Sequence, residues 1–203
     1  ARVTDLTGAQ DSERTGAFLQ RVWQDGSNSL GFAFHEDEHM TARFNLPGGA
    51  SVPAGDYDWM RYSAVYDTGA SRDWSLRGEV EIGDWYDGER TLYNFSGDYR
   101  PNRHLNFKAA YQQNDISVSG GDVQIKVVYA DMIVNITPDM QITNQLQYDN
   151  ISEGLGYFGR FRWAIRPQTE LLVTYSQGAQ ADIDLLRATQ SGLSIRIGNT
   201  YRF

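Results

Sequence analysis

The chain has 203 residues and a formal net charge of −8, with no cysteine and with 20 Gly, 12 Tyr and 9 Phe against only 5 Pro. This composition favours β structure within one domain, and the negative charge argues against a nucleic-acid partner. No stretch approaches the roughly 18 consecutive apolar residues of a membrane helix. The mean hydropathy of −0.52 fits a soluble protein, but it also fits a membrane β-barrel, because half of each barrel strand faces a polar interior.

Alternating side chains predict eleven strands. A strand that crosses a membrane at a tilt needs about 9 to 11 residues, with an apolar row towards lipid and a polar row towards the barrel interior. Single-chain bacterial barrels have even strand numbers. We therefore expect a transmembrane antiparallel β-barrel of about 12 strands, or the C-terminal part of a larger barrel. The predicted strands are 16–24, 30–44, 57–66, 74–82, 91–99, 105–112, 123–136, 140–148, 155–165, 171–176 and 193–203.

The twelfth strand has two candidate sources. One is the segment 2–6, and the other is a split of the long segment 30–44. Residues 1–15 are accordingly either an extra strand or an N-terminal linker, within an outer-membrane barrel domain that covers 1–203.

A candidate metal motif lies within the strand predicted over 30–44. The run His35-Glu-Asp-Glu-His39 satisfies both the H-E-x-x-H and the H-x-x-E-H patterns of zinc peptidases. Those motifs need a helix, whereas the flanking residues here alternate as in a strand. On a strand His35, Asp37 and His39 share one face, which makes them weak metal candidates. The alternative is a solvated acidic extension of the strand above the membrane.

Charge is confined to one face of the strand predicted over 74–82. Its even-numbered residues are apolar or glycine, and its odd-numbered residues are polar. The strands over 91–99, 105–112 and 155–165 show a similar separation. An Arg or Lys on the lipid face at mid-bilayer costs roughly 2 to 4 kcal/mol, so we expect the charged row to face the interior. The candidate pore-lining residues are Arg77, Glu79, Glu81, Asp98, Lys108, Arg160, Arg162 and Arg196.

The charged row has two interpretations. Rings of charge can tune a water-filled pore, or opposite charges on neighbouring strands can pair and plug a narrow barrel. A soluble β-sandwich also alternates, but the many outward Tyr and Trp residues are typical of the aromatic girdles of membrane barrels. The strand over 123–136 is the exception, because it carries apolar residues on both faces. We expect it to span the membrane with its interior face packed against something.

Connection lengths predict an orientation. Tight turns at 100–103, 137–140 and 166–169 are expected on the periplasmic side, where barrel turns are short. The longer connections are then extracellular, and they are 45–56, 83–90, 113–122, 149–154 and 176–191.

The segment 193–203 alternates strictly and stops on an aromatic residue. Tyr201 and Phe203 continue the apolar row of Leu193, Ile195 and Ile197. Such an ending resembles the closing strand of Gram-negative outer-membrane barrels. The resemblance implies that the barrel-assembly machinery recognises Tyr201 and Phe203.

Five short motifs carry a second resemblance, and they occur at 52–57, 83–88, 99–101, 146–150 and 160–163 (VPAGDY, GDWYDG, YRP, LQYDN and RFRW). As a set they resemble the C-terminal outer-membrane β-barrel domain of unknown function that usually follows a family 9-like carbohydrate-binding module in Gram-negative bacteria. The likeness extends over roughly 30–203 and implies an outer-membrane location. It supplies no catalytic residue, and the binding module that usually precedes the domain is missing from this sequence.

The functional hypothesis is a channel or a translocation and anchoring scaffold, related to glycans, that needs no cofactor. One alternative is an outer-membrane barrel hydrolase with its site at the extracellular rim. Another is a structural subunit of a larger outer-membrane complex. The expected partners are outer-membrane lipid, the barrel-assembly machinery and other outer-membrane subunits.

Overall fold

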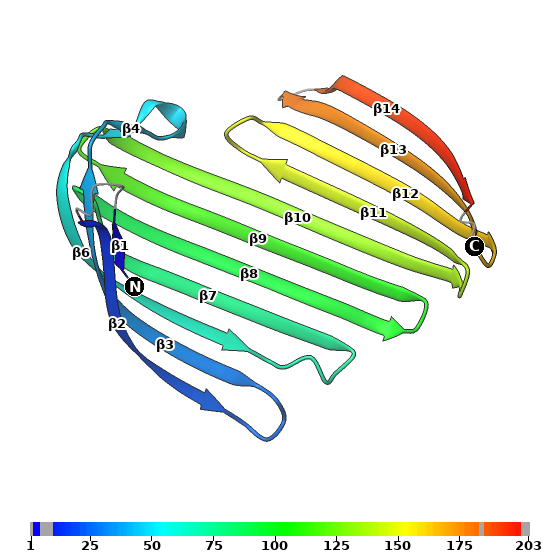
Figure 1. The fold of residues 1–203 in the computed structure, drawn as a ribbon, viewed down its shortest axis with the longest axis horizontal. Coiled ribbons are helices and arrows are strands. Elements are labelled where there is room, and N and C mark those ends of the chain that lie inside the picture. Colours follow the sequence, from blue (N-terminus) through cyan, green and yellow to red (C-terminus); the bar gives the residue numbers. More distant parts are fainter. Residues whose placement is uncertain (1, 5–9, 183–184, 200–203) are drawn as a thin grey trace. The chain divides into compact units, whose positions relative to one another are not determined.

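The computed structural model describes residues 2–4, 10–182 and 185–199. Twelve strands of this part form one antiparallel sheet, and two short strands, β4 and β5, pair separately (Figure 1). The large sheet contains, in order, β1 (Arg2–Thr4), β2 (Gln10–Val22), β3 (Asn28–Met40), β6 (Gly55–Asp67), β7 (Trp74–Trp85), β8 (Gly88–Asn102), β9 (Leu105–Val118), β10 (Gly121–Thr137), β11 (Met140–Asp149), β12 (Gly154–Arg166), β13 (Thr169–Asp182) and β14 (Leu185–Asn199). None of the described residues forms a helix that is long and apolar enough to cross a membrane.

The predicted all-β antiparallel class is confirmed, and each predicted strand falls largely within a strand of the structure. The twelfth strand of the large sheet is β1, which pairs with β2 at the start of the chain. The segment 30–44 does not split into two strands of this sheet, because Phe44–Asn45 pairs as β4 with β5 (Ser51–Val52). β1 and β14 stand at the two ends of the sheet order.

The prediction of long connections over 83–90, 113–122 and 176–191 is wrong. Most of these residues belong to strands, and only residues 86–87 and 119–120 separate the first two pairs of strands. The polar residues in these segments favour loops in a prediction from sequence. Backbone ladders can continue through them, because a strand needs paired N–H and C=O groups rather than apolar side chains. The longest connection is 41–54, between β3 and β6.

The chain divides into two compact units. The first comprises 1–71, 76–95 and 112–126, and the second comprises 72–75, 96–111 and 127–203. Each unit has strands with two different faces, as follows from the alternation of side chains along a strand. We call these the charged face and the apolar face of each unit.

In the first unit, β6 shows the two faces most clearly. Trp59, Arg61 and Ser63 are buried on its charged face, whereas Met60 and Tyr62 are exposed on its apolar face. Residues that are directly opposite on neighbouring strands lie on the same face, so the two faces continue across the unit. Phe34 of β3 is opposite Arg61, and Glu81 of β7 is opposite Ser63.

In the second unit, the register carries the apolar face from β11 to β14. Leu146 is opposite Tyr157, and Tyr175 of β13 is opposite Leu193 of β14. Arginines lie on the other face, where Arg162 is opposite Leu172, which in turn is opposite Arg196.

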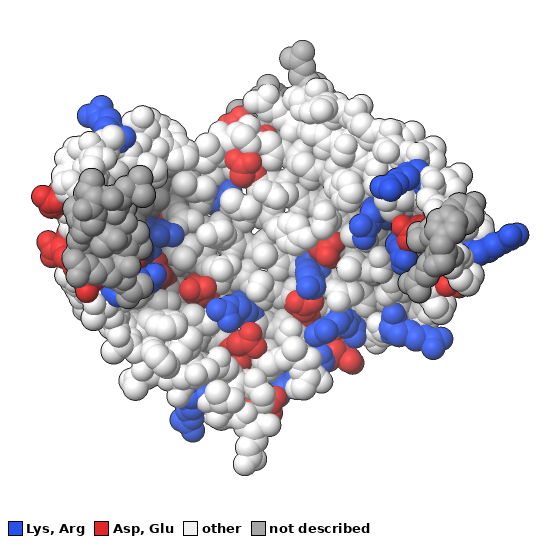
Figure 2. Space-filling view, viewed as in Figure 1, with Lys and Arg blue, Asp and Glu red and all other residues white. Residues whose placement is uncertain are grey.

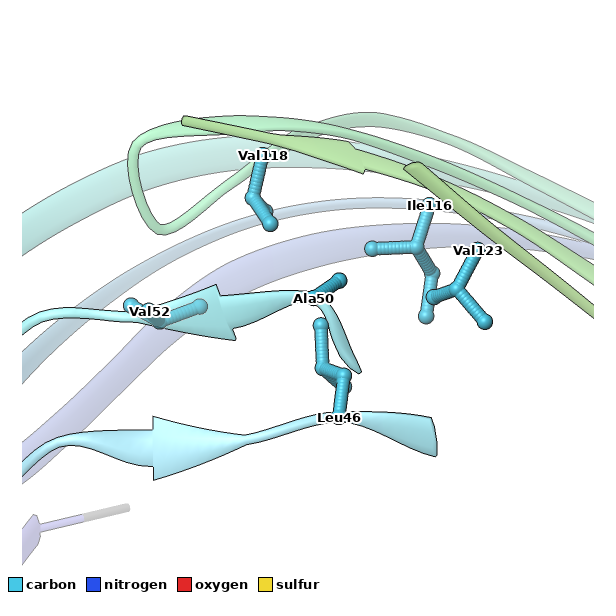
Figure 3. Close-up of a cluster of buried hydrophobic side chains, with 6 residues drawn as sticks. All are labelled: Leu46, Ala50, Val52, Ile116, Val118 and Val123. Atoms are coloured by element: carbon cyan, nitrogen blue, oxygen red, sulfur yellow. The ribbon is translucent and has the colours of Figure 1, made fainter. Parts of the chain in front are cut away.

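The 41–54 connection folds onto the first unit and provides its most completely buried side chain. It contains β4, a short 3-10 turn over Pro47–Gly49 and β5. Its Leu46, Ala50 and Val52 pack against side chains of β9 and β10, which are Ile116, Val118 and Val123. Figure 3 shows Leu46 and Ala50 pointing towards these residues of β9 and β10. Val52 is 0% exposed, so this apolar cluster fixes the connection to β9 and β10.

The cluster lies on the charged face. Asn114, Ile116 and Val118 alternate along β9, so they share one face, and Asn114 accepts hydrogen bonds from Arg90 of the charged face. Val123, at the start of the segment 123–136, also packs against the connection. The segment therefore packs against the connection at Val123, and that this face lies inside a barrel stays a prediction.

Gly120 in the β9–β10 turn allows the close approach of the 41–54 connection. A methyl group on Gly120 would overlap the carbonyl oxygen of Ser51 and lie 2.8 Å from its backbone nitrogen. We expect Gly120→Ala to lower the free energy of unfolding by about 1 to 3 kcal/mol, as other overpacking substitutions do, measured by urea titration in detergent. The matched substitution Gly198→Ala, where none of the described residues lies within 4 Å of the added carbon, should be nearly neutral, and equal effects would contradict this explanation.

Candidate functional site

Arg61 is the centre of an ionic network on the charged face of the first unit. Its side chain is only 7% exposed, and its Nη1 lies 3.9 Å from Oε2 of Glu36. Its Nη2 contacts Oε1 of Glu81, and Glu81 also faces Nη1 of Arg90 at 3.9 Å. Arg61 is therefore held between one carboxylate on β3 and another on β7. A buried cation is tolerated in such a place because it is paired.

The network continues on both sides. Nε of Arg14 lies 3.3 Å from Oε1 of Glu36, and Nε1 of Trp59 donates a 3.0 Å hydrogen bond to Oε2 of Glu36. On the other side Arg90 donates two hydrogen bonds, of 3.0 and 2.7 Å, to Oδ1 of Asn114. We call Arg14, Glu36, Arg61, Glu81 and Arg90 the ionic row, and it runs across β2, β3, β6, β7 and β8.

Aromatic rings cover the arginines of the ionic row. The guanidinium carbon of Arg14 lies 3.7 Å from the ring centroid of Phe34, and that of Arg61 lies 5.5 Å from the same ring. Arg90 lies 5.8 Å from the ring centroid of Trp85. Planar guanidinium groups stack on aromatic faces in this way, which compensates part of their lost hydration. The ionic row is thus a packed part of the charged face, in which each charged side chain has a partner of opposite charge.

Tyr86 joins the ionic row to the 41–54 connection. It lies in the two-residue turn between β7 and β8, contacts the ring of Trp59 at a centroid distance of 4.8 Å, and packs against the apolar cluster. Its hydroxyl donates a 3.0 Å hydrogen bond to Oε2 of Glu38. Burial, and then the negative charge of Glu38, raise the pKa of Tyr86, so it stays a neutral donor. The connection therefore packs on aromatic and apolar side chains next to the ionic row.

The predicted residues of β7 lie on one face, but only one of them belongs to the ionic row. Glu81 pairs with Arg61 and Arg90. Arg77 is half-exposed and lies 4.0 Å from Asp67, and Glu79 is opposite Val65 in the register.

The other predicted charged residues lie in the second unit. Nζ of Lys108 is 3.8 Å from Oδ1 of Asp98, and Nε of Arg162 is 2.6 Å from Oε2 of Glu170. Arg160 lies two residues before Arg162 on the same face of β12. Acidic and basic side chains are interspersed on the face seen in Figure 2, as pairing of this kind requires. Whether these residues line a pore stays a prediction.

The motif residues His35, Asp37 and His39 share a face of β3, and that face is the apolar one. His35 lies 3.3 Å from Asp37 and 3.7 Å from Asp58, while His39 contacts Asp56. Within the described ranges no group of three or more His, Cys, Asp or Glu side chains is arranged to hold a metal. The predicted assembly residues Tyr201 and Phe203 lie outside the described residues.

The residues predicted from the sequence do not include Arg14, Glu36, Arg61 and Arg90, which are four of the five residues of the ionic row. A signal was present for Arg61. In the segment 57–66 the even-numbered residues from 60 onward are Met, Tyr, Ala and Tyr, so they form an apolar row and place Arg61 on the opposite face. Sequence alone contains no comparable signal for the partners, since the register between strands decides which carboxylate meets which guanidinium.

No family model matches the chain, and no curated protein sequence matches it at a significant level. Among solved structures, the chain is similar to one titled "NanC porin structure in rhombohedral crystal form", with 14% sequence identity and a TM-score of 0.40. The alignment covers 95% of this chain and 94% of that chain. The resemblance to the barrel domain of unknown function therefore stays a prediction.

Proposed function

We propose that the chain forms a closed transmembrane β-barrel in the outer membrane of a Gram-negative bacterium and acts as a channel. The observation that carries the proposal is the exposed apolar face. Leu193, Ile195 and Ile197 of β14 are 69%, 65% and 70% exposed, and the apolar face of β6 exposes Met60 and Tyr62. Contiguous exposed apolar surface of this kind marks a region that is covered by lipid or by a partner. Charged rows on the opposite face support lipid as the cover, because a barrel places that face in its interior.

The sheet order supports closure. An even number of strands, all joined to their neighbours along the chain, is the arrangement of bacterial barrels. Pairing of the strands at the two ends of the order would satisfy the backbone groups that a membrane cannot hydrogen-bond. The charged faces would then line the lumen, and the 41–54 connection, which packs on one of them, would narrow it.

The resemblances in the sequence add three further elements to the proposal. They are recognition by the barrel-assembly machinery, association with other outer-membrane subunits, and passage or anchoring of glycan-related material. These elements rest on the motifs alone, and the channel proposal does not depend on them.

Cysteine labelling in planar bilayers tests the channel and its faces together, because the chain has no cysteine of its own. Ser194 and Ile195 are neighbours on opposite faces of β14, opposite Thr174 and Val173 respectively. We expect steady conductance from the purified protein, and a charged, water-soluble thiol reagent should reduce the conductance of Ser194→Cys. The matched variant Ile195→Cys should be unaffected, because its thiol faces lipid.

Two outcomes would contradict the proposal. Equal sensitivity of the two cysteine variants would contradict the assignment of the faces. A folded barrel that never conducts would contradict the channel and favour an anchoring scaffold.

A further inference from the structure

Two neighbouring rows of the second unit are rich in hydrogen-bond donors. In the first row Thr143, Arg160, Thr174 and Ser194 are successive partners across β11 to β14. In the second row the successive partners are Gln141, Arg162, Leu172 and Arg196. Three guanidinium groups, three hydroxyls and one amide therefore lie on one continuous area of the charged face. We call Arg160, Arg162 and Arg196 the arginine wall.

Two of the three arginines have no ion pair within the described part of the chain. Arg162 is paired with Glu170 at 2.6 Å, but no acidic side chain of the described residues forms a salt bridge with Arg160 or Arg196. Nε of Arg160 is buried and has no hydrogen-bond partner there. In the ionic row of the first unit Nε of Arg61 is also buried without a hydrogen-bond partner, but every arginine there faces a carboxylate or an amide oxygen. Guanidinium groups without an ion pair can donate hydrogen bonds to a bound oxyanion.

A hollow beside the arginine wall provides the space. Its volume is about 610 Å³, and its lining includes Arg162, Arg196, Leu172 and Gly198 but not Arg160. Among the described residues, nothing lies within 4 Å of a carbon added at Gly198, so these residues leave the space in front of it open. The volume lies within the usual range for small-molecule sites.

The charges around the hollow favour an anion. Its lining contains three arginines, at 162, 166 and 196, and two acids, Asp139 and Glu170. Glu170 is already engaged by Arg162. Guanidinium groups bind carboxylate and phosphate oxygens through paired hydrogen bonds, which makes arginine well suited to oxyanions.

We propose that the arginine wall binds small carboxylate- or phosphate-bearing solutes, and that the channel prefers anions. This inference rests on the proposed function for the path to the wall, but binding itself does not require conduction. Arg166 and Arg196, which line the hollow, bind the anion, and Arg160, two residues before Arg162 on the same face, adds positive charge beside it. Arg162, oriented by Glu170, adds a third guanidinium.

Ion selectivity gives the first test. In planar bilayers without lipopolysaccharide and under a tenfold gradient of KCl, the reversal potential of the wild-type channel should have the sign of anion preference. The double variant Arg160→Gln/Arg196→Gln should lower the anion-to-cation permeability ratio at least threefold. Arg21→Gln is the matched control, because Arg21 of β2 is opposite Ser29 on the apolar face, and it should leave the ratio unchanged. A cation-selective wild type, or a double variant with unchanged selectivity, would overturn the proposal.

Direct binding gives the second test, and it keeps the two proposals separate. Inorganic phosphate is titrated against detergent-solubilised protein by equilibrium dialysis, with folding of each variant checked by the heat-modifiable shift in gel mobility. We expect saturable binding to the wild type and at least a tenfold weaker Kd for the double variant. A silent barrel that binds phosphate would overturn the channel but keep the site. A conducting barrel that binds no phosphate would overturn the site but keep the channel.

Discussion

Replacing Arg61 with methionine is expected to lower the free energy of unfolding by about 3 to 5 kcal/mol, which is the usual cost of removing one partner from a buried ion pair. The physical reason is the state of the two carboxylates that remain. Glu36 and Glu81 lie on either side of Arg61, with side chains only 22% and 12% exposed. Without the guanidinium, both carboxylates would lose the buried cation between them, and only Arg14 would remain beside Glu36 and only Arg90, at 3.9 Å, beside Glu81. Arg61→Lys should recover part of the loss, because it restores the charge but not the planar contact with Phe34.

Arg77→Met is the matched control for Arg61→Met. Both substitutions remove one arginine from the charged face of the first unit, but Arg77 and its partner Asp67 are 46% and 34% exposed and 4.0 Å apart. Exposed pairs are worth about 0 to 1 kcal/mol, so the control should be almost as stable as the wild type. The measurement is the urea midpoint of refolded protein in detergent, followed by tryptophan fluorescence. Equal urea midpoints for the two variants would show that the ionic row does not stabilise the folded protein.

Replacing Val52 with aspartate is expected to release the 41–54 connection from β9 and β10. Val52 is 0% exposed and packs with Leu46 and Ala50 against β9 and β10. An ionised carboxylate has no partner in this cluster, and burying it there would cost more than detaching the connection. The rest of the sheet should stay folded, because its ladders do not depend on β4 or β5. A connection that leaves the charged face should also widen the proposed channel.

Limited proteolysis and conductance measure the release of the connection independently. Trypsin should cut Val52→Asp after Arg43, which lies in the connection, at least tenfold faster than it cuts the wild type. Single-channel conductance should rise in the same variant. Asn45→Asp adds the same charge to the small β4–β5 sheet at an exposed position, and it should change neither quantity. Rapid cleavage without a change in conductance would show that the connection does not narrow the channel.

Most of the large sheet could be predicted from the sequence, since alternation of apolar and polar residues identifies strands and separates their faces. The segments 74–82 and 155–165 are the clearest cases, and the register places the members of each predicted row on one face. Strand ends were less predictable. Polar residues after Ile82 and after Tyr111 suggested loops, whereas β7 and β9 continue to Trp85 and Val118.

The candidate site was less accessible to sequence reasoning than the strands. Eight charged residues were predicted on the polar rows, but only Glu81 belongs to the ionic row. The contact between Arg61 and Glu81 depends on how β6 and β7 are aligned, and sequence does not specify that alignment. The packing of Leu46 and Val52 on β9 and β10 was also missed, because the residues that meet are far apart along the chain.

The separation of these residues along the chain determines when they meet during folding. Leu46 and Val52 find their partners only after residues 116–123 have been synthesised and paired, and contacts between remote segments form late because the intervening chain must be ordered first. Until then the apolar residues of the 41–54 connection stay exposed to solvent and available to a chaperone. Docking of the connection therefore requires β9 and β10 to be in place, and a chain that has not yet formed these strands would leave Leu46 and Val52 exposed.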